Sequence, residues 1–306
     1  MKKQVKCLSL LSGGLDSMLA IKILEANGVK VQPISFVSYF FNSKSAQTAC
    51  DNQGWKLRVE DISEEHLKMV KNPKHGHGSA YNPCIDCHLM MLKEAKKIME
   101  AEGYDFIATG EVVGQRPMSQ NRNALALIEK EAELVGKIVR PLCLKALGET
   151  EAEKKGIINR DGFYDISGRA RTRQIELAKE LGIKDYPSPA GGCILTEVVY
   201  GKLLATLFKL KPKADGNDCL IMRQGRVFFK DNTLIVVARD HGECLALEKL
   251  HKKTDIILKP ENFMGPVVIL RSFKKIPKEE IIEIGIEYIL EYSKNVPENF
   301  AIELVQ

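Results

Sequence analysis

Long hydrophobic runs and export signals are missing from this sequence of 306 residues. No apolar stretch approaches the roughly 20 residues that a membrane-spanning helix needs. The segment from Met1 to Lys6 leads directly into a short strand-like run, without the charged and then apolar pattern of a signal peptide. A Walker phosphate motif, G-x-x-x-x-G-K followed by Ser or Thr, is absent as well. We therefore expect a cytoplasmic protein without a membrane partner, and we disfavour Walker-type kinases and GTPases.

The net charge and the cysteine content further limit the functional classes to which the protein could belong. The formal net charge of +5 is compatible with a nucleic-acid partner but does not require one. In a chain without an export signal, the eight cysteines should stay reduced, so clustered ones predict metal or redox chemistry rather than disulfides. Most of the cysteines read as single core or surface residues, whereas Cys84, Cys87 and Cys193 lie in distinctive motifs.

The first part of the chain alternates short apolar runs with helical spacing, which is typical of a parallel sheet covered by helices. Strands are expected at residues 5–11, 31–37, 56–59 and 106–109, and further apolar runs at 125–128 and 138–140 close this part. Helices are expected at residues 15–26, 43–54, 85–102, 150–156 and 172–182. The polar segment 71–83 is long for an ordered connection, which suggests a lid or a binding loop.

The pattern changes near residue 197. Short strands are expected at residues 219–222, 227–229, 233–237 and 267–270, with a final helix at 277–292. We therefore predict a first domain at residues 1–196 and a smaller α+β domain at residues 197–306.

The string Ser12-Gly13-Gly14-Leu15-Asp16-Ser17 lies where the first expected strand turns into the first expected helix. Backbone N–H groups and the positive end of the helix dipole favour an anion at such a turn. Glycines let a phosphate approach closely, and the two serine hydroxyls add donors. A carboxylate beside a polyphosphate makes sense if Asp16 holds Mg²⁺. The alternative is an ordinary strand–turn–helix in which the polar residues are caps.

This string matches the SGGxDS signature of the PP-loop ATP pyrophosphatases. The resemblance implies an α/β fold with a doubly wound parallel sheet, like that of adenine nucleotide α-hydrolases. It also implies that ATP is cleaved between its α and β phosphates, which leaves an adenylated carbonyl oxygen on the substrate. The motif does not identify the nucleophile that then displaces AMP.

The segment Asn82-Pro83-Cys84-Ile85-Asp86-Cys87 places a CxxC motif at the start of an expected helix, where thiol pKa values fall. Cys193 follows Gly191 and Gly192 in a turn-rich loop. A closed zinc site needs four ligands, and the sequence offers no convincing fourth. We favour three thiolates that hold a [4Fe–4S] cluster with one open iron. A persulfide on Cys193 that is resolved by a CxxC thiol is the alternative.

The CxxC and the distant Gly-Gly-Cys loop resemble the tRNA thiouridine synthetases, most closely the short 4-thiouridine synthetases of that family. The resemblance covers residues 5–196 and implies ATP or phosphate contacts at Gly110, Gln115 and Arg116, although Arg116 could also be a solvated loop residue. Glu111 departs from the His-Tyr usual in the 2-thiouridylases, which argues against a wobble-uridine enzyme.

These observations predict an enzyme that adenylates a tRNA uridine and replaces its carbonyl oxygen with sulfur, with Asp16, Cys84 and Cys193 as catalytic residues. Sulfide or a cysteine desulfurase would supply the sulfur. The alternatives are an amide-forming PP-loop ligase and a non-catalytic iron–sulfur protein that binds RNA.

Candidates for holding tRNA are two sets of basic residues. The arginines Arg169, Arg171 and Arg173 could equally be solvated charges before a helix, and the lysines Lys202, Lys209, Lys211 and Lys213 have a solvated helix face as the more common alternative. Residues 213–272 weakly resemble the RNA-binding domain of NFACT proteins. The same basic end could instead form a homodimer surface.

Overall fold

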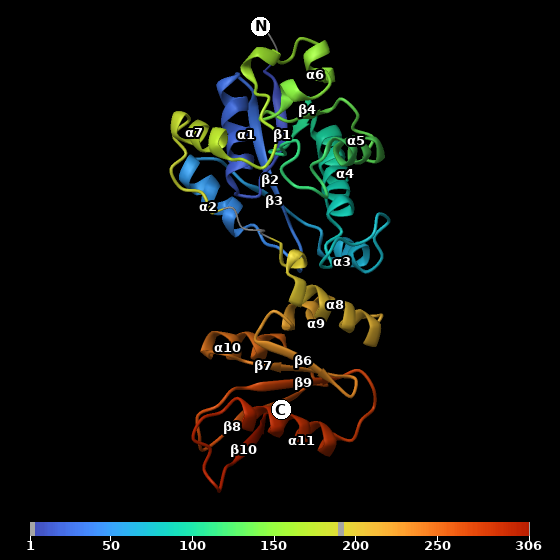
Figure 1. Ribbon diagram of the computed structural model, residues 1–306, viewed down its shortest axis with the longest axis vertical. Helices are drawn as coiled ribbons and strands as arrows, with labels where there is room; N and C mark the ends of the chain where they lie inside the picture. The colour runs from blue at the N-terminus through green and yellow to red at the C-terminus, as the bar shows by residue number, and fades with distance from the viewer. Residues whose placement is uncertain (1–3, 189–192, 306) are drawn as a thin grey trace. The chain divides into compact units, whose positions relative to one another are not determined.

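The computed structural model describes residues 4–188 and 193–305, and the chain divides into two compact units, Met1–Thr196 and Glu197–Gln306. Within the described residues, every helix is too short or too polar to cross a membrane. Figure 1 shows the elements of each unit along the chain.

The first unit contains a parallel five-stranded sheet in the order β3-β2-β1-β4-β5. The strands are β1 (Lys6–Leu10), β2 (Lys30–Val37), β3 (Arg58–Asp61), β4 (Phe106–Ala108) and β5 (Ile138–Val139). The helices are α1 (Leu15–Ala26), α2 (Lys44–Gln53), α3 (Ser63–Lys71), α4 (Cys84–Glu102), α5 (Arg122–Glu131), α6 (Glu151–Lys154) and α7 (Thr172–Glu180). Short 3₁₀ turns lie at Leu144–Ala146, Arg160–Gly162 and Ile194–Thr196.

Both faces of this sheet are buried, as the apolar character of β1 predicts. Side chains alternate along a strand, so Cys7 and Leu8 point to opposite faces and belong to separate cores. Helices α1, α2 and α7 pack on the Cys7 side, and α4 and α5 pack on the Leu8 side (Figure 1). The predicted doubly wound α/β fold is therefore confirmed.

The strand order reverses at β1, which pairs with β2 on one edge and with β4 on the other. In open α/β sheets, ligands bind outside the carboxyl ends of the strands at such a switch point. The turn after β1 holds Ser12–Ser17, and the turn after β4 holds Gly110 and Glu111. The fold thus brings together two segments that are distant in the sequence. The hydrogen bond between the side chains of Asp16 and Gln115, for example, joins residues 99 positions apart.

The second unit contains an antiparallel five-stranded sheet in the order β10-β8-β9-β7-β6. Its strands are β6 (Arg226–Lys230), β7 (Thr233–Val237), β8 (Ile256–Pro260), β9 (Val268–Ser272) and β10 (Ile302–Val305). Its helices are α8 (Val198–Leu210), α9 (Gly216–Ile221), α10 (His241–Leu250) and α11 (Lys278–Glu291). Helix α11 packs against the sheet through a core that includes Leu258, Leu270, Ile284 and Ile289.

The apolar run 125–128, for which no element type was predicted, lies in α5, where Leu125 and Ile128 are buried at helical spacing. One sequence-based prediction, a strand at residues 219–222, was wrong. The run 219–222 lies in and just after α9, not in a strand, because Asp215 and Asp218 form a capping box that starts a helix there. The D-x-x-D pattern of this capping box is present in the sequence and could have predicted the helix.

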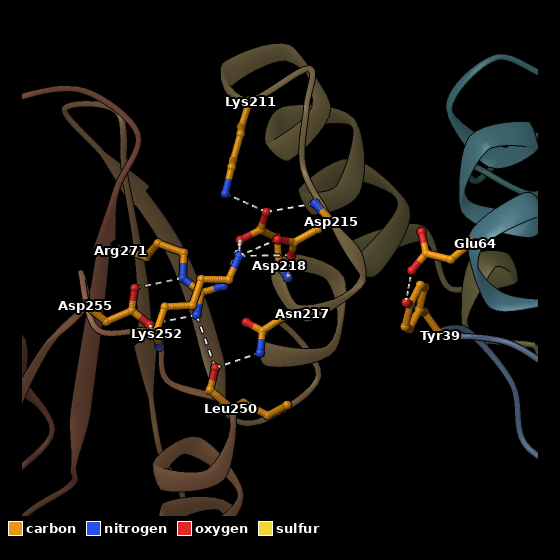
Figure 2. A network of polar contacts seen from close by, with 10 residues as sticks. All are labelled: Tyr39, Glu64, Lys211, Asp215, Asn217, Asp218, Leu250, Lys252, Asp255 and Arg271. Atoms are coloured by element: carbon orange, nitrogen blue, oxygen red, sulfur yellow. Dashed lines mark hydrogen bonds and ion pairs between the residues drawn. The ribbon is translucent and has the colours of Figure 1, made fainter.

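Asp218 is also the centre of a buried charge network in the second unit (Figure 2). Its Oδ1 accepts hydrogen bonds from Arg271 Nη1 at 2.7 Å and from Lys252 Nζ at 2.9 Å. Lys211 Nζ lies 2.7 Å from Oδ2. Although burial alone would raise the pKa of the Asp218 carboxyl, the lysines and the backbone N–H of Asp215 hold that pKa well below its ordinary value.

Replacing Asp218 with asparagine should therefore destabilise the second unit by about 3–5 kcal/mol, because buried cations lose their counter-charge. Thermal unfolding of the full chain followed by circular dichroism measures the change. Glu283→Gln removes an exposed carboxylate from α11 and should leave the unfolding temperature unchanged. Equal behaviour of the two variants would contradict a stabilising role for this network.

Candidate functional site

The turn after β1 is held in shape by its own hydroxyl groups. Ser17 Oγ donates a hydrogen bond to the Gly14 carbonyl at 2.8 Å and accepts one from the Ser12 backbone N–H at 3.3 Å. Ser12 Oγ lies 3.3 Å from Ser17 Oγ and accepts from the Gly14 N–H at the same distance. The two serines therefore shape the loop as well as line it, and α1 begins directly after it at Leu15.

Glycine is required at position 13 for two reasons. Its φ of +81° lies in the left-handed region, and a Cβ there would come within 2.2 Å of the Ser45 backbone carbon in α2. The loop therefore packs directly against the first turn of α2, which leaves its backbone fixed and ready to meet a phosphate.

Asp16 faces three groups from distant segments. Gln115 Nε2 donates to Asp16 Oδ2 at 2.9 Å, and the positive charges of Arg116 and Arg171 act on the carboxylate. Burial is the largest influence and raises the pKa of Asp16 above its ordinary value, and Gln115, the two arginines and the nearby Gln174 amide oppose that shift. The structure thus places the sequence-predicted residues Asp16, Gln115 and Arg116 in one neighbourhood.

A bridge between Val113 and Ser167 explains how Arg171 reaches this neighbourhood. The Gly168 N–H donates to the Val113 carbonyl at 2.7 Å, so the segment before α7 lies beside the segment after β4. The charge of Arg171, one of the candidate tRNA contacts, therefore also acts on the Asp16 carboxylate. Arg173 pairs with Glu176 and Glu180 on the surface, and Lys211 pairs with Asp218, so these two candidates are compensated by acids.

Several buried polar atoms around Asp16 lack a hydrogen-bond partner within the described residues. They are Asp16 Oδ1, Arg171 Nε and both side-chain polar atoms of Gln174. Gln174 is fully buried in α7, whose Leu177 and Ala178 share a core with α1. Leaving such groups unsatisfied costs about 1–3 kcal/mol each, so their convergence beside a phosphate loop points to a polar ligand. Sequence reasoning missed Gln174, because only the packing of α7 on α1 brings it here.

The turn after β4 touches the first turn of α1 directly. A Cβ on Gly110 would lie within 2.6 Å of the Asp16 backbone, so only glycine fits. The next residue, Glu111, is buried and bonded on both oxygens: His88 Nδ1 donates to Oε1 at 2.8 Å, and Arg140 Nε donates to Oε2 at 2.9 Å. Burial opposes ionisation of Glu111, but Arg140 and His88 outweigh it and lower the carboxyl pKa to about 2. His88 stands one residue after the CxxC, so Glu111 links the cysteine helix to the phosphate loop.

Replacing Glu111 with glutamine should cost about 3 kcal/mol of stability at pH 7, because buried Arg140 then keeps only Glu129 as a counter-ion. Because the pKa of Glu111 is lowered in the folded chain, its ionised form stabilises the fold. The ionised carboxylate stabilises the wild type fully above its ordinary pKa of 4.5, and this contribution is lost as the pH falls towards about 2. Unfolding measured between pH 2 and 7 should therefore show a steeper acid loss for the wild type than for Glu111→Gln; parallel curves would contradict the assignment.

The three singled-out cysteines have unequal surroundings. Cys84 is half-buried at the first position of α4, and Asn82 Nδ2 donates to its Sγ at 3.1 Å. Cys87 is buried, with its Sγ 3.0 Å from Nε2 of the fully buried His66. Burial first, then the charges of Cys193 and Cys84, raise the pKa of the Cys87 thiol well above its ordinary value. Cys84 and Cys193 therefore both lie within electrostatic range of the Cys87 thiol.

His66 is a residue that sequence reasoning missed. Burial lowers its pKa to about 4, so the imidazole is neutral at pH 7. It packs edge-on against Phe40 and Phe41, and these contacts come from chain segments far from the CxxC.

The described side chains do not form a metal site of the expected kind. Across residues 4–188 and 193–305, no three His, Cys, Asp or Glu side chains are arranged to hold a metal ion. Cys193 itself is described and half-buried, but Gly191 and Gly192 of its loop lie outside the described residues. The donor set that we predicted for a [4Fe–4S] cluster, Cys84, Cys87 and Cys193, is therefore not assembled in this structure.

The first unit, which contains the phosphate loop, is similar in sequence to known proteins. A family model described as "Thiamine biosynthesis protein (ThiI)" matches residues 2–173. Proteins named "Probable tRNA sulfurtransferase" from Methanosarcina mazei and Thermococcus kodakarensis are 29% identical over 177 residues and 28% identical over 176 residues. These alignments cover 55% and 54% of this chain but only 41% and 42% of those proteins, so the chain spans less than half the length of these curated relatives.

Among solved structures, a 4-thiouridine synthetase–RNA complex with bound ATP is similar. Its TM-score is 0.41 at 22% identity, and the match covers 71% of this chain and 54% of that one.

Proposed function

Because the chain belongs to the ThiI family, we propose that it is a tRNA sulfurtransferase. It uses ATP to adenylate a tRNA uridine and replaces the carbonyl oxygen with sulfur, and 4-thiouridine is the favoured product. The family match over residues 2–173 confirms the family that the motif at Ser12–Ser17 indicated. The observation that carries the proposal is the group of unpartnered buried atoms of Asp16, Arg171 and Gln174 beside the phosphate loop.

The first step joins the uridine oxygen to the α-phosphorus of ATP, and the bond to the β-phosphate breaks to release pyrophosphate. The loop backbone and the start of α1 would hold the phosphates. Arg116 and Arg171 would bind the departing pyrophosphate, which guanidinium groups contact in a bidentate manner. The unpartnered Oδ1 of Asp16 fits a Mg²⁺ ligand, and that ion would neutralise phosphate charge when bound.

The second step needs a sulfur nucleophile, and we propose that the cysteines carry it. In the persulfide route, the terminal sulfur of a Cys193 persulfide attacks the adenylated carbon, and AMP leaves. A thiolate from Cys84 or Cys87 then attacks the inner sulfur of Cys193, which releases the thiouridine and leaves a disulfide. An external thiol must reduce that disulfide before the next cycle. The [4Fe–4S] cluster stays a prediction, and no step is routed through it.

The sulfur donor also remains a prediction: a cysteine desulfurase would transfer sulfane sulfur to Cys193 in the persulfide route, whereas sulfide, which is already fully reduced, would suit only the cluster route. A homodimer, a cytoplasmic location and the NFACT resemblance of residues 213–272 remain predictions as well.

The test is an ATP–pyrophosphate exchange assay with and without unmodified tRNA, followed by mass spectrometry of the tRNA nucleosides. Exchange that depends on tRNA, together with a thiouridine product, is the expected result. Exchange with a small acid and no RNA would identify the amide-forming ligase instead, and no exchange with any substrate would favour a binding protein. Iron and sulfide analysis of anaerobically purified protein, with its visible spectrum, decides between the cluster and the persulfide route.

A further inference from the structure

A groove of about 850 Å³ opens on the second unit. It lies between the start of β8, the end of β9, the start of α11 and the end of β10. Four exposed lysines line it: Lys253, Lys274, Lys275 and Lys278. We refer to it as the lysine groove. None of these lysines was singled out by the sequence, because the two lysine-bearing segments, 251–255 and 274–278, come together only through the pairing of β8 with β9.

The charge of the lysine groove is not neutralised by its own lining. Its one acidic lining residue is Asp255, whose two oxygens accept from Arg271 at 2.9 and 2.7 Å. Lys252 is held by Asp215 and Asp218 (Figure 2). Within the part of the chain that the structure describes, the four lysines of the groove make no ion pair. The groove therefore presents about four uncompensated positive charges to solvent.

The floor of the lysine groove is apolar. It is formed by side chains that are buried or half-buried: Ile256, Ile257, Ile276, Ile281, Leu304 and Val305. A ligand that fits must therefore be extended, carry several negative charges and tolerate a flat apolar surface. A single phosphate or carboxylate would leave most of the lysines unpaired, whereas a nucleic-acid strand offers one negative charge per nucleotide together with bases and sugars.

We propose that the lysine groove binds the phosphate backbone of an RNA segment. This inference rests on the proposed function, which supplies tRNA as the substrate. An anionic membrane surface fits less well, because the large exposed hydrophobic side chains of this unit, such as Val199 and Met264, lie outside the groove lining. Lysine ammonium groups contact phosphates as point charges and do not read bases, so the groove positions tRNA and does not select the uridine.

The test compares two quadruple variants of the full chain. Lys253, Lys274, Lys275 and Lys278 are replaced by alanine in the first. The control replaces four exposed lysines of the same unit that lie outside the groove and are not among the tRNA candidates named from the sequence: Lys230, Lys249, Lys259 and Lys294. Fluorescence anisotropy with an unmodified tRNA transcript is measured across a salt series. We expect the groove variant to lose about tenfold or more in affinity and its salt slope to fall by roughly three to four, about one for each phosphate contact. The control should stay within about twofold.

Equal losses in the two variants, or an unchanged salt slope in the groove variant, would overturn the proposal. Loss of binding to anionic lipid vesicles without loss of binding to tRNA would overturn it in favour of a membrane ligand. Direct binding separates this inference from the proposed function. Groove-dependent tRNA binding without thiouridine formation would leave the groove intact and refute the sulfurtransferase, whereas full tRNA binding and thiouridine formation by the groove variant would refute only the groove.

Discussion

Replacing Asp16 with asparagine is expected to lower the rate of tRNA-dependent ATP–pyrophosphate exchange at least about a hundredfold, the scale seen when a preorganised electrostatic contact is lost. The substituted side chain keeps its shape and can still accept from Gln115 Nε2, so the loop should persist. What disappears is the charge that the unpartnered Oδ1 would offer to a phosphate-bound Mg²⁺. Initial exchange rates at saturating ATP, magnesium and tRNA measure the effect.

The stability of Asp16→Asn distinguishes loss of chemistry from loss of folding. Because burial raises the pKa of Asp16, the ionised carboxylate is disfavoured in the folded chain, and removing its charge should leave the melting temperature unchanged or higher. Asp51→Asn makes the same charge change at an exposed position of α2 and should keep full exchange activity. A lower melting temperature in Asp16→Asn, or equal activity in the two variants, would contradict a catalytic role for Asp16.

The phosphate loop was predictable because its signals are local. The glycines, the serines and the helical spacing that follows fix α1 at Leu15–Ala26, the bounds expected from the sequence. Only some of the groups that surround Asp16 could be predicted from the sequence. Gln115 and Arg116 were expected from family resemblance, whereas Arg171 and Gln174 reach the site through the Val113–Ser167 bridge and the packing of α7 on α1.

The second unit was harder to predict for a related reason. Strands β6, β7 and β9 have runs of β-branched or aromatic residues and were found, but β8 and β10 were missed. Strand β10 is a four-residue edge strand whose side chains are at most half-buried, so its sequence alternates only weakly. The lysine groove depends on both missed strands, which is why the sequence led instead to the lysines of α8.

The different surroundings of the three cysteines could not be predicted from the sequence either. Spacing could place Cys84 and Cys87 near the start of one helix, and it could not show that they differ in burial. The thiol pKa of Cys87 is raised by burial and by its neighbouring thiols, so this residue is a poor thiolate in the resting chain. Cys84 and Cys193 are the more exposed pair, which makes them better placed to meet a sulfur donor and an adenylated uridine.

Replacing Cys193 with serine should therefore abolish thiouridine formation, because a hydroxyl cannot carry a persulfide, while tRNA-dependent ATP–pyrophosphate exchange continues within about threefold of the wild-type rate. Adenylation depends on the turns after β1 and β4, where Cys193 has no assigned role. Nucleoside mass spectrometry and the exchange assay give the two readouts on one preparation.

Cys244→Ser is the matched control for Cys193→Ser. It removes a cysteine of similar partial exposure from α10, and both thiouridine formation and exchange should survive. If Cys193→Ser loses exchange and thiouridine formation together, Cys193 holds the structure of the site and does not transfer sulfur. If Cys193→Ser retains thiouridine formation, Cys193 does not carry the sulfur, and the CxxC thiols become the candidates, because Cys87 is the thiol on which the Cys193 charge acts and Cys84 is its neighbour.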